Sequence, residues 1–423
     1  MGEPDVVVFL VLLIVVAAVA ATVRVVRIPY TVALVLTGLA LALLPQAPLL
    51  QLTPRLILTV FLPVLLFYGA YNLDLAVLRA NTLAITLMAV PGVLVTAALV
   101  GAVLHLTTGL PWLEALIFGS IVAATDPVAV LALFGELGAP RRLTTLVSGE
   151  SLFNDGAALV VFATLLGIAT AGTVDPGTTV ERFLIEAAGG VILGAGVGLV
   201  GSLVLQRVDD ALLETTLTLI MAYGGYLLAD RLGSSGPLAT VMAGVLLGRR
   251  GTHVMSPATR VQAHAIWEFL DFLANSLVFL LMGLALRPIG HMTITRLGWG
   301  VWWPLVVAIV AVSVARAVVV GVVGVILAHT RRPLSPGWRL VLIWAGLRGA
   351  VSLAAALSLP PSLHGRDLLL TLTFGIVLFT ILVQGGTLHL LLERLEADTE
   401  ERPRRGPVGT ADEDHRAQTS EAQ

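Results

Sequence analysis

Apolar runs about as long as a lipid bilayer is thick follow one another through most of the chain. A hydrocarbon layer about 30 Å thick takes about 20 helical residues to cross, so each run predicts a transmembrane helix. The runs, separated by Gly, Pro or charged residues, lie at 5–23, 29–44, 54–71, 82–106, 112–134, 145–172, 178–206, 211–230, 236–248, 263–286, 299–328, 338–359 and 367–393. We therefore predict an all-α polytopic membrane protein with about 13 transmembrane helices.

The composition supports this fold class and excludes several functions. Hydrophobic residues make up 57% of the chain and charged residues 12%, whereas soluble domains carry about 25% charged residues. The net charge of -2 gives no reason to expect a nucleic-acid partner. With Cys 0, disulfides, thiol nucleophiles and thiolate metal sites are excluded. We expect a protein surrounded by lipid that is not an enzyme and needs no cofactor.

Arginine indicates the orientation, because all 25 basic residues are Arg. One set of predicted connections and span ends contains Arg24, Arg27, Arg79, Arg141, Arg142, Arg207, Arg249, Arg250, Arg260, Arg331, Arg332 and Arg339. The other set contains Arg55, Arg182, Arg231, Arg287, Arg296 and Arg366. The positive-inside rule makes the richer side cytoplasmic. We expect a cell-membrane protein with its N-terminus outside, residues 1–395 as one transmembrane unit, and residues 396–423 as a disordered cytoplasmic tail.

Two of the predicted helices are interrupted at matching places. Spans 1–6 and 8–13 make two sets of six, and the second set starts seven crossings after the first, so it is inverted in the membrane. The fifth span of the first set contains A-T-D-P at 124–127, and the fifth span of the second contains G-L-R-G at 346–349. We therefore predict two inverted six-helix repeats whose interrupted helices cross near the midplane and leave backbone groups free.

Charged residues inside these spans need an explanation, since a charge at the bilayer centre costs about 2.5 to 3.5 kcal/mol. Asp126 precedes Pro127, which removes a backbone donor and disfavours helix at the residue before it. The carbonyl groups of residues 123–125 and the Thr125 hydroxyl are then hard oxygen ligands that suit Na⁺ and K⁺. Two interpretations stay open and are compatible: an ion or helix-dipole role for Asp126, or a plain helix break in which Asp126 caps the following half-helix.

The segment G-E-S-L-F-N-D-G at 149–156 places Glu150 with Asn154, and Ser151 with Asp155, four residues apart. Residues at this spacing are neighbours on a helix, so one face carries two rows of polar side chains. Inside a helix bundle, Asp155 would bind either a proton or a cation, and binding one would expel the other. The alternative is a turn at the membrane edge whose carboxylates are solvated.

Two arginines lie inside apolar spans. Arg348 needs a buried anion or free carbonyl groups, and Glu150 is its best available partner. A lipid headgroup is the alternative for Arg348. For Arg316, a buried partner and snorkelling of the side chain to the interface are equally good interpretations.

Four motifs carry a family resemblance: T-D-P-V-A-V at 125–130, G-E-S-L-F-N-D-G, N-S-L-V-F-L-L-M-G at 275–283 and G-L-R-G-A-V-S-L-A at 346–354. With them the chain closely resembles, over nearly all of residues 5–395, the monovalent cation:proton antiporter-1 family, the sodium/proton exchangers, in its prokaryotic NhaP-like branch. The resemblance implies a core bundle with two crossed, interrupted helices and a dimerisation bundle. It also implies a homodimer that exchanges a monovalent cation for H⁺.

The resemblance assigns roles to individual residues. It makes Asp155 the transport carboxylate, with Thr125, Asp126 and Ser151 shaping the Na⁺ or K⁺ site. Asn154 stands where the family has an Asn beside that Asp, a pair associated with electroneutral exchange. Glu150 and Arg348 match a conserved buried ion pair that would have a structural role.

One position departs from the family pattern. Many prokaryotic members have L-L-F-E-x-A in the third span, but this chain has L-L-F-Y-G-A, so Tyr68 replaces a glutamate that is a candidate cation ligand. Neither Asn72 nor Asp74 is an evident replacement, because Asp74 is expected near the cytoplasmic end of the span. Asn275 and Ser276 are expected at most to support the residues that contact the ion, since hydrogen bonds in helix packing also explain them.

The main functional prediction is exchange of Na⁺, with K⁺ or Li⁺ as alternatives, for protons by alternating access. A passive cation channel would use the same acidic site without obligatory proton coupling. A remote alternative is an intramembrane serine protease, because G-S-S-G at 233–236 satisfies a G-x-S-G pattern. An N-cap before Pro237 explains that segment better.

Overall fold

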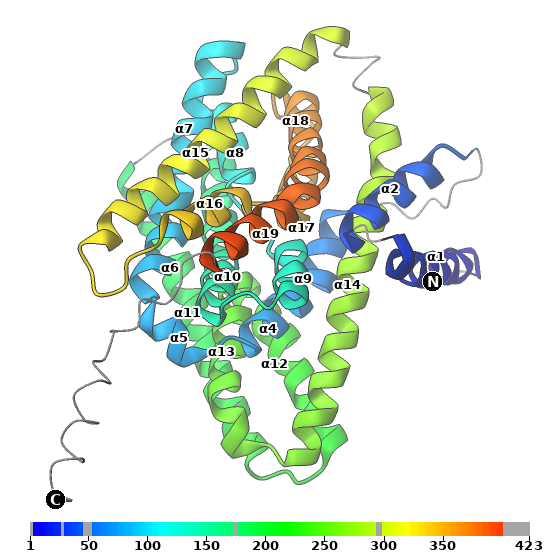
Figure 1. Cartoon of the computed structure of the whole chain (residues 1–423), viewed down its shortest axis with the longest axis vertical. Helices are drawn as coiled ribbons and strands as arrows, with labels where there is room; N and C mark the ends of the chain where they lie inside the picture. Colours follow the sequence, from blue (N-terminus) through cyan, green and yellow to red (C-terminus); the bar gives the residue numbers. More distant parts are fainter. Residues whose placement is uncertain (1–2, 27–28, 45–52, 172–175, 293–297, 401–423) are drawn as a thin grey trace, which may run out of the picture.

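The computed structural model describes residues 3–26, 29–44, 53–171, 176–292 and 298–400, and this part of the chain is helical without a β-strand (Figure 1). The first half of the chain forms α1 (Glu3–Val26), α2 (Tyr30–Ala42), α3 (Pro54–Leu56), η1 (Ile57–Phe61), α4 (Leu62–Tyr71), α5 (Leu75–Ala80), α6 (Thr82–Ala89), α7 (Pro91–Thr108), α8 (Trp112–Ile121), α9 (Val128–Leu137) and α10 (Arg141–Ala171). The second half forms α11 (Pro176–Leu205), α12 (Ala211–Arg231), α13 (Gly236–Val254), α14 (Pro257–Met292), η3 (Gly298–Val301), α15 (Trp302–Ala328), α16 (Pro336–Trp344), α17 (Ala350–Leu357), α18 (Arg366–Phe379), η4 (Thr380–Gly385) and α19 (Gly386–Glu400). The all-α prediction is confirmed.

The helices have the length and surface of membrane spans. Eight of them, among the described residues, are long and apolar enough to cross a bilayer. On α15, one face of the helix is exposed. It carries valines four residues apart, namely Val306, Val310, Val314, Val318 and Val322. The opposite face of α15 is buried and includes Ala308 and Ala315. A stripe of exposed valines of this length is what a helix presents to lipid.

Both predicted helix interruptions are confirmed. In the first, α8 ends at Ile121 and α9 begins at Val128, directly after Pro127. In the second, α16 ends at Trp344 and α17 begins at Ala350. Each break therefore leaves a short half-helix on either side, and the start of the second half-helix points its free N–H groups into the break.

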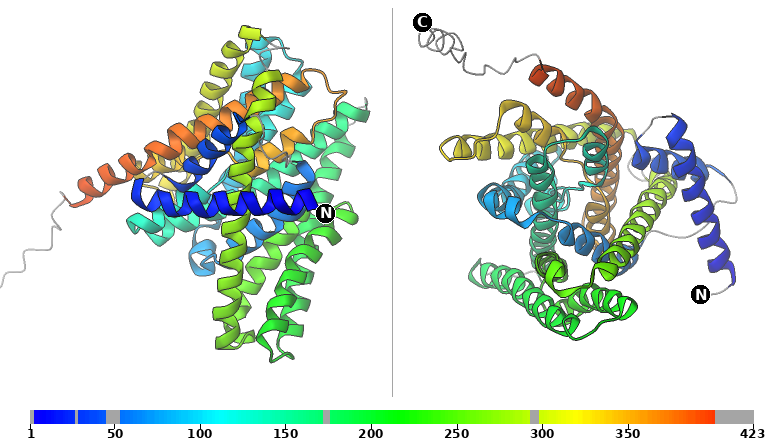
Figure 2. Two further views of the ribbon diagram at one scale, coloured as in Figure 1. Left: turned by 90° about the vertical axis from the view of Figure 1, so that its right-hand side faces the viewer. Right: turned by 60° about the horizontal axis from the view of Figure 1, so that its bottom comes forward.

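The helices pack in two groups. In one group α2 packs against α14, α4 against α13, and α11 and α12 against α13. In the other, α7 packs against α8 and α15, α10 against α6 and α8, and α17 against α18. The right-hand view of Figure 2 shows the green α11–α13 at the bottom, with the yellow α15 and the red α19 at the top. Contacts of α10 with α4 and α13 join the groups, so α10 lies at their boundary.

Glycine residues allow a close helix crossing in the first group. At the crossing of α2 and α14, a Cβ atom on Gly38 would meet the backbone of Leu280 and Gly283. Gly283 is the last residue of the N-S-L-V-F-L-L-M-G motif, and its own Cβ would meet the backbone of Val35 and Gly38. Packing of this kind brings helices together in lipid, where no hydrophobic effect drives association. It joins α14 closely to α2.

The last span extends past the predicted domain boundary. Helix α19 continues to Glu400, so residues 396–400, predicted as the start of a disordered tail, are helical. Residues 401–423 of that predicted tail lie outside the described part of the chain.

Candidate functional site

The two helix interruptions meet at Asp126. Its backbone N–H donates to the carbonyl oxygen of Leu347 at 2.8 Å, which ties one break to the other. Its carboxylate accepts hydrogen bonds from the backbone N–H of Val128, at 3.0 Å, and from that of Ala350. Val128 and Ala350 are the first residues of α9 and α17, so one carboxylate faces the N-termini of both half-helices. The positive ends of two helix dipoles favour an anion there.

Arg348 satisfies the carbonyl groups that the first break sets free. The residue is 1% exposed, and its Nη1 donates to the carbonyl oxygens of Ala123 and Ala124 at 3.3 and 3.2 Å. Its backbone N–H donates to Oγ1 of Thr380, at 3.1 Å, in the π-helical turn η4. The sequence predicts these carbonyl groups as ligands for a cation, but the structure uses them to anchor an arginine.

The predicted ion pair between Glu150 and Arg348 is wrong. Glu150 pairs with Arg316 instead, whose Nη1 donates to Oε1 at 2.5 Å and whose Nη2 donates to Oε2 at 2.7 Å. Nε of Arg316 donates to the carbonyl oxygen of Leu342 at 3.0 Å. The two side chains of the pair are 7% and 2% exposed. Of the two interpretations of Arg316, the buried partner is confirmed, and the pair is bidentate.

The two polar rows on α10 serve different neighbours. Asn154 turns toward the ion pair, and its Nδ2 donates to Oε1 of Glu150 at 3.4 Å. Ser151 and Asp155 turn toward the first break instead. The Ser151 hydroxyl donates to the carbonyl oxygen of Thr125 at 2.5 Å, and the Asp155 carboxylate accepts a hydrogen bond from the backbone N–H of Thr125. The segment is therefore buried helix, and the alternative of a solvated membrane-edge turn is wrong.

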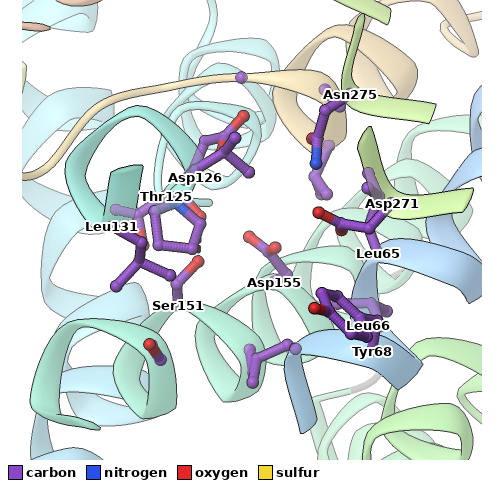
Figure 3. A pocket seen from close by; sticks show the side chains of 18 of the residues that line it. Leu65, Leu66, Tyr68, Thr125, Asp126, Leu131, Ser151, Asp155, Asp271 and Asn275 are labelled. Carbon is purple, nitrogen blue, oxygen red and sulfur yellow. Dashed lines mark hydrogen bonds between the residues drawn. The ribbon is translucent and has the colours of Figure 1, made fainter. Parts of the chain in front are cut away.

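A cavity of about 640 Å³ lies between the two groups of helices. The second group contributes polar side chains at and near the breaks, namely Thr125, Asp126, Ser151, Asp155 and Ser352. The first group contributes Tyr68, Asn72, Glu268, Asp271 and Asn275 from the opposite wall. Figure 3 shows the carboxylates of Asp126, Asp155 and Asp271 turned toward a common space. Asp155 is 6% exposed whereas Asn72 and Glu268 are exposed, so Asp155 lies deep in the cavity and the other two lie at its mouth.

Three buried oxygen atoms on the side of the cavity formed by the second group of helices have no partner. They are Oδ1 of Asp155, Oγ1 of Thr125 and Oγ of Ser352. An unpaired buried oxygen is costly, so a group of them around one cavity indicates a ligand that supplies the missing interaction. Oxygen atoms of this kind bind hard cations, and a carboxylate also binds a proton. No three acidic or histidine side chains in the described ranges are grouped tightly enough for a resident metal ion. The free oxygen atoms at this wall suit a hard cation or a proton.

Of the remaining site residues predicted from the sequence, some line the cavity and others lie outside its lining. Tyr68 and Asn275 line the cavity, whereas Asn154 and Ser276 are outside its lining. The Ser276 hydroxyl is hydrogen-bonded to that of Tyr30 at 2.7 Å, so it joins α14 to α2. Asp74 caps α5 by accepting from the N–H groups of residues 76 and 77.

The sequence analysis missed several polar residues of the cavity wall, among them Asp271 and Ser352. Asp271 lies on α14 one helical turn before Asn275, and an acid inside an apolar span is the signal that identifies it. Ser352 lies in the A-V-S-L-A part of the fourth motif, and its hydroxyl is fully buried. A small hydroxyl in a helix usually bonds its own backbone, so nothing in the sequence singled out Ser352.

The G-S-S-G segment has a structural role. Ser235 caps α13 by accepting from the N–H of Leu238 at 3.4 Å, and Pro237 occupies the first turn. This confirms the N-cap interpretation.

Comparisons with known proteins agree with this geometry. The family described as "Sodium/hydrogen exchanger, transmembrane" matches residues 10–394. A relative named Na(+)/H(+) antiporter ApNhaP, from Aphanothece halophytica, is 41% identical over 374 residues, covering 87% of this chain and 70% of the relative. The low-affinity Na(+)/H(+) antiporter NhaS1 of Synechocystis is 40% identical over 392 residues, covering 90% of this chain and 72% of the relative.

A solved structure supports the fold. The sodium proton antiporter MjNhaP1 from Methanocaldococcus jannaschii superposes with a TM-score of 0.75 at 20% sequence identity. The match covers 93% of this chain and 98% of the other. At this identity the likeness concerns the arrangement of the helices.

Proposed function

This chain belongs to the sodium/hydrogen exchanger family, and on that premise we propose that Na⁺ and H⁺ compete for Asp155 during alternating access. The chain is a multi-pass membrane protein, and exchange of Na⁺ for H⁺ agrees with the relatives' names. A protein that binds one ion or the other at one carboxylate couples their fluxes without an external energy source. A passive channel has no such requirement, and a protease would need a nucleophile that Ser235 does not provide.

The observation that carries the proposal is the unpaired Oδ1 of Asp155. This carboxylate is 6% exposed and has one oxygen free at the deep end of the cavity. Its other contact, the Thr125 backbone N–H, suits the anionic form that a cation would bind. The free hydroxyl oxygens of Thr125 and Ser352 are placed to complete a shell around a cation that has lost most of its water. We therefore assign Asp155 as the transported ion's main ligand, with Thr125, Ser151 and Asp126 shaping the site.

Na⁺ is the proposed cation, with K⁺ and Li⁺ as alternatives. The relatives' names mention Na⁺, and the hard oxygen ligands here accept any of the three. Tyr68 puts a neutral phenol where a glutamate is common in related chains, which reduces the negative charge of the α4 wall.

We further propose that the cavity opens to the cytoplasm and that the N-terminus is outside. The mouth residue Asn72 is followed by α5 with Arg79, and α14 starts shortly after Arg249 and Arg250. By the positive-inside rule these arginine-rich ends are cytoplasmic. We place the protein in the cell membrane as a homodimer, which an orientation assay and cross-linking in membranes would test.

The deciding experiment uses the wild-type protein and Asp155→Asn in proteoliposomes with a pH-sensitive dye inside. Adding Na⁺ outside should move protons in wild-type vesicles. Asp155→Asn should abolish the signal while the protein still inserts, because the amide keeps the shape but binds no proton. Glu136→Gln, an exposed acid at the end of α9 outside the cavity, is the control and should transport normally. Normal exchange by a well-folded Asp155→Asn protein would contradict the assignment.

A further inference from the structure

Asp271 is an acid in the cavity wall that competition at Asp155 does not use. It lies on α14 in the first group of helices, whereas Asp126 and Asp155 belong to the second group. Figure 3 shows its carboxylate pointing across the cavity toward Asp155, with Asn275 and Tyr68 on the same wall. The Asn275 side chain is hydrogen-bonded to it, and its charged neighbours are Asp126 and Glu268. The carboxylate is therefore oriented into the space through which the ion moves.

Acidic groups mark a path from the mouth of the cavity to its deep end. Glu268 is exposed, Asp271 is half-buried, and Asp155 is 6% exposed. Glu268 and Asp271 are three residues apart on α14, which corresponds to about 4.5 Å along the helix. A cation that leaves water would thus meet one negative charge at the mouth, one on the wall and one at the end. Negative walls of low dielectric raise the local cation concentration.

Two further features point to a ligand at this place. The unpaired oxygens of Asp155 and Thr125 are more than nine-tenths buried and face the same cavity, so the space between the walls lacks a partner for them. Beside Asp271, the α4 part of the wall carries Tyr68, a neutral phenol, and α4 contributes no carboxylate to the lining. Asp271 supplies the missing negative charge from the neighbouring helix.

We propose that Asp271 is a second cation-binding carboxylate, a station on the α14 wall that takes the ion before it reaches Asp155. The inference rests on the proposed exchange function. Asp271 is half-buried on the wall and Asp155 lies deeper in the cavity, so an ion entering from the mouth reaches Asp271 first. Because they belong to different helix groups, a relative movement of the groups would change the gap that the ion crosses.

The test measures the Na⁺ dependence of exchange at fixed ionic strength in proteoliposomes. Asp271→Asn should raise the apparent KM for Na⁺ at least about threefold, as expected for removing one charge near the ion path, and should keep most of the rate at saturating Na⁺. Asp271→Ser is a second neutral variant in case the amide folds poorly. Glu136→Gln should leave KM unchanged.

A double variant that moves the carboxylate from α14 to α4 tests the assignment further. Tyr68→Glu combined with Asp271→Asn restores one carboxylate to the same wall from α4, and should return KM toward the wild-type value. A merely structural role of Asp271 would not be rescued in this way. An unchanged KM in both neutral variants, with wild-type exchange intact, overturns the station at Asp271. Absence of Na⁺-dependent proton movement in the wild type would instead overturn the proposed function.

Discussion

At the scale of single residues, the buried pair of Glu150 and Arg316 holds α10 to α15. Both hydrogen bonds of the bidentate pair are short, and Nε of Arg316 also anchors α16 through Leu342. Such a pair seldom increases net stability, because both charges are desolvated, but losing one partner strands the other. The main effect of the pair is to fix the position of α10 relative to α15, and therefore the position of Asp155 on α10.

Removing one partner should therefore lower the free energy of unfolding strongly. Removing both partners should lower it by less than the sum of the two single losses. Glu150→Ala or Arg316→Ala should each cost about 3 to 5 kcal/mol, since each leaves an uncompensated buried charge. The double variant should recover part of that loss, a coupling of about 0.5 to 3 kcal/mol. Thermal unfolding in detergent measures the cycle.

A second cycle serves as the control. Glu150→Ala and Arg348→Ala should couple more weakly than the first pair, because Arg348 donates its hydrogen bonds to the carbonyl groups of Ala123 and Ala124, whereas Arg316 pairs directly with Glu150. Additivity of Glu150 with Arg316 together with strong coupling to Arg348 would contradict the structure.

The error over Arg348 shows where residue-level prediction stops. The cost of burying a charge follows from the sequence, so Arg348 was predicted to need a partner, whereas for Arg316 a buried partner and snorkelling were equally good interpretations. Which arginine meets the glutamate depends on how α10, α15 and the second break are placed in space, and no local spacing encodes that. Asp126 was easier, because Pro127 beside it imposes the break locally.

At the scale of elements, the crossing of the two breaks depends on Gly349. A Cβ atom there would overlap the Asp126 carboxylate. Glycine is therefore required for space, since its φ of -149 is available to any residue. Both breaks were predictable from their helix-breaking residues, whereas their mutual contact through Asp126 and Leu347 is a tertiary feature.

Gly349→Ala should separate the half-helices. We expect the unfolding free energy to fall by about 1 to 3 kcal/mol, the usual cost of overpacking, and Na⁺/H⁺ exchange to drop with it. Gly321→Ala on α15 is the matched control, because nothing lies within 4 Å of a Cβ there. It should leave stability unchanged or slightly raised. A Gly349→Ala protein as stable and active as the control would show that the two breaks do not need this close approach.

At the scale of the whole molecule, function depends on the space between two helix groups. The helix runs were predictable, because apolar length and breakers are local properties of the sequence. The position of Asp271 opposite Asp155 was not, since it depends on how α14 packs against α2 and α4. The motifs thus identified most of the residues around Asp155, whereas the position of Asp271 across the cavity became evident only from the packing of α14.

The number of protons exchanged per cation follows from which carboxylates in this cavity titrate. Asn154 beside Asp155 carries no proton, so Asp155 alone would exchange one proton for one Na⁺ and move no net charge. We expect Asp126 to stay ionised, because it accepts hydrogen bonds at the N-termini of both α9 and α17. Exchange should then be electroneutral.

The measurement is the steady-state pH gradient in proteoliposomes at fixed Na⁺ concentrations, with membrane potential clamped by K⁺ and valinomycin. A gradient that does not change with voltage supports one proton per cation. A clear dependence on voltage would contradict the single-carboxylate mechanism, and Asp271→Asn would then identify the second carrier. If the voltage dependence disappears in that variant, Asp271 carries the additional proton, and if it persists, Asp126 does.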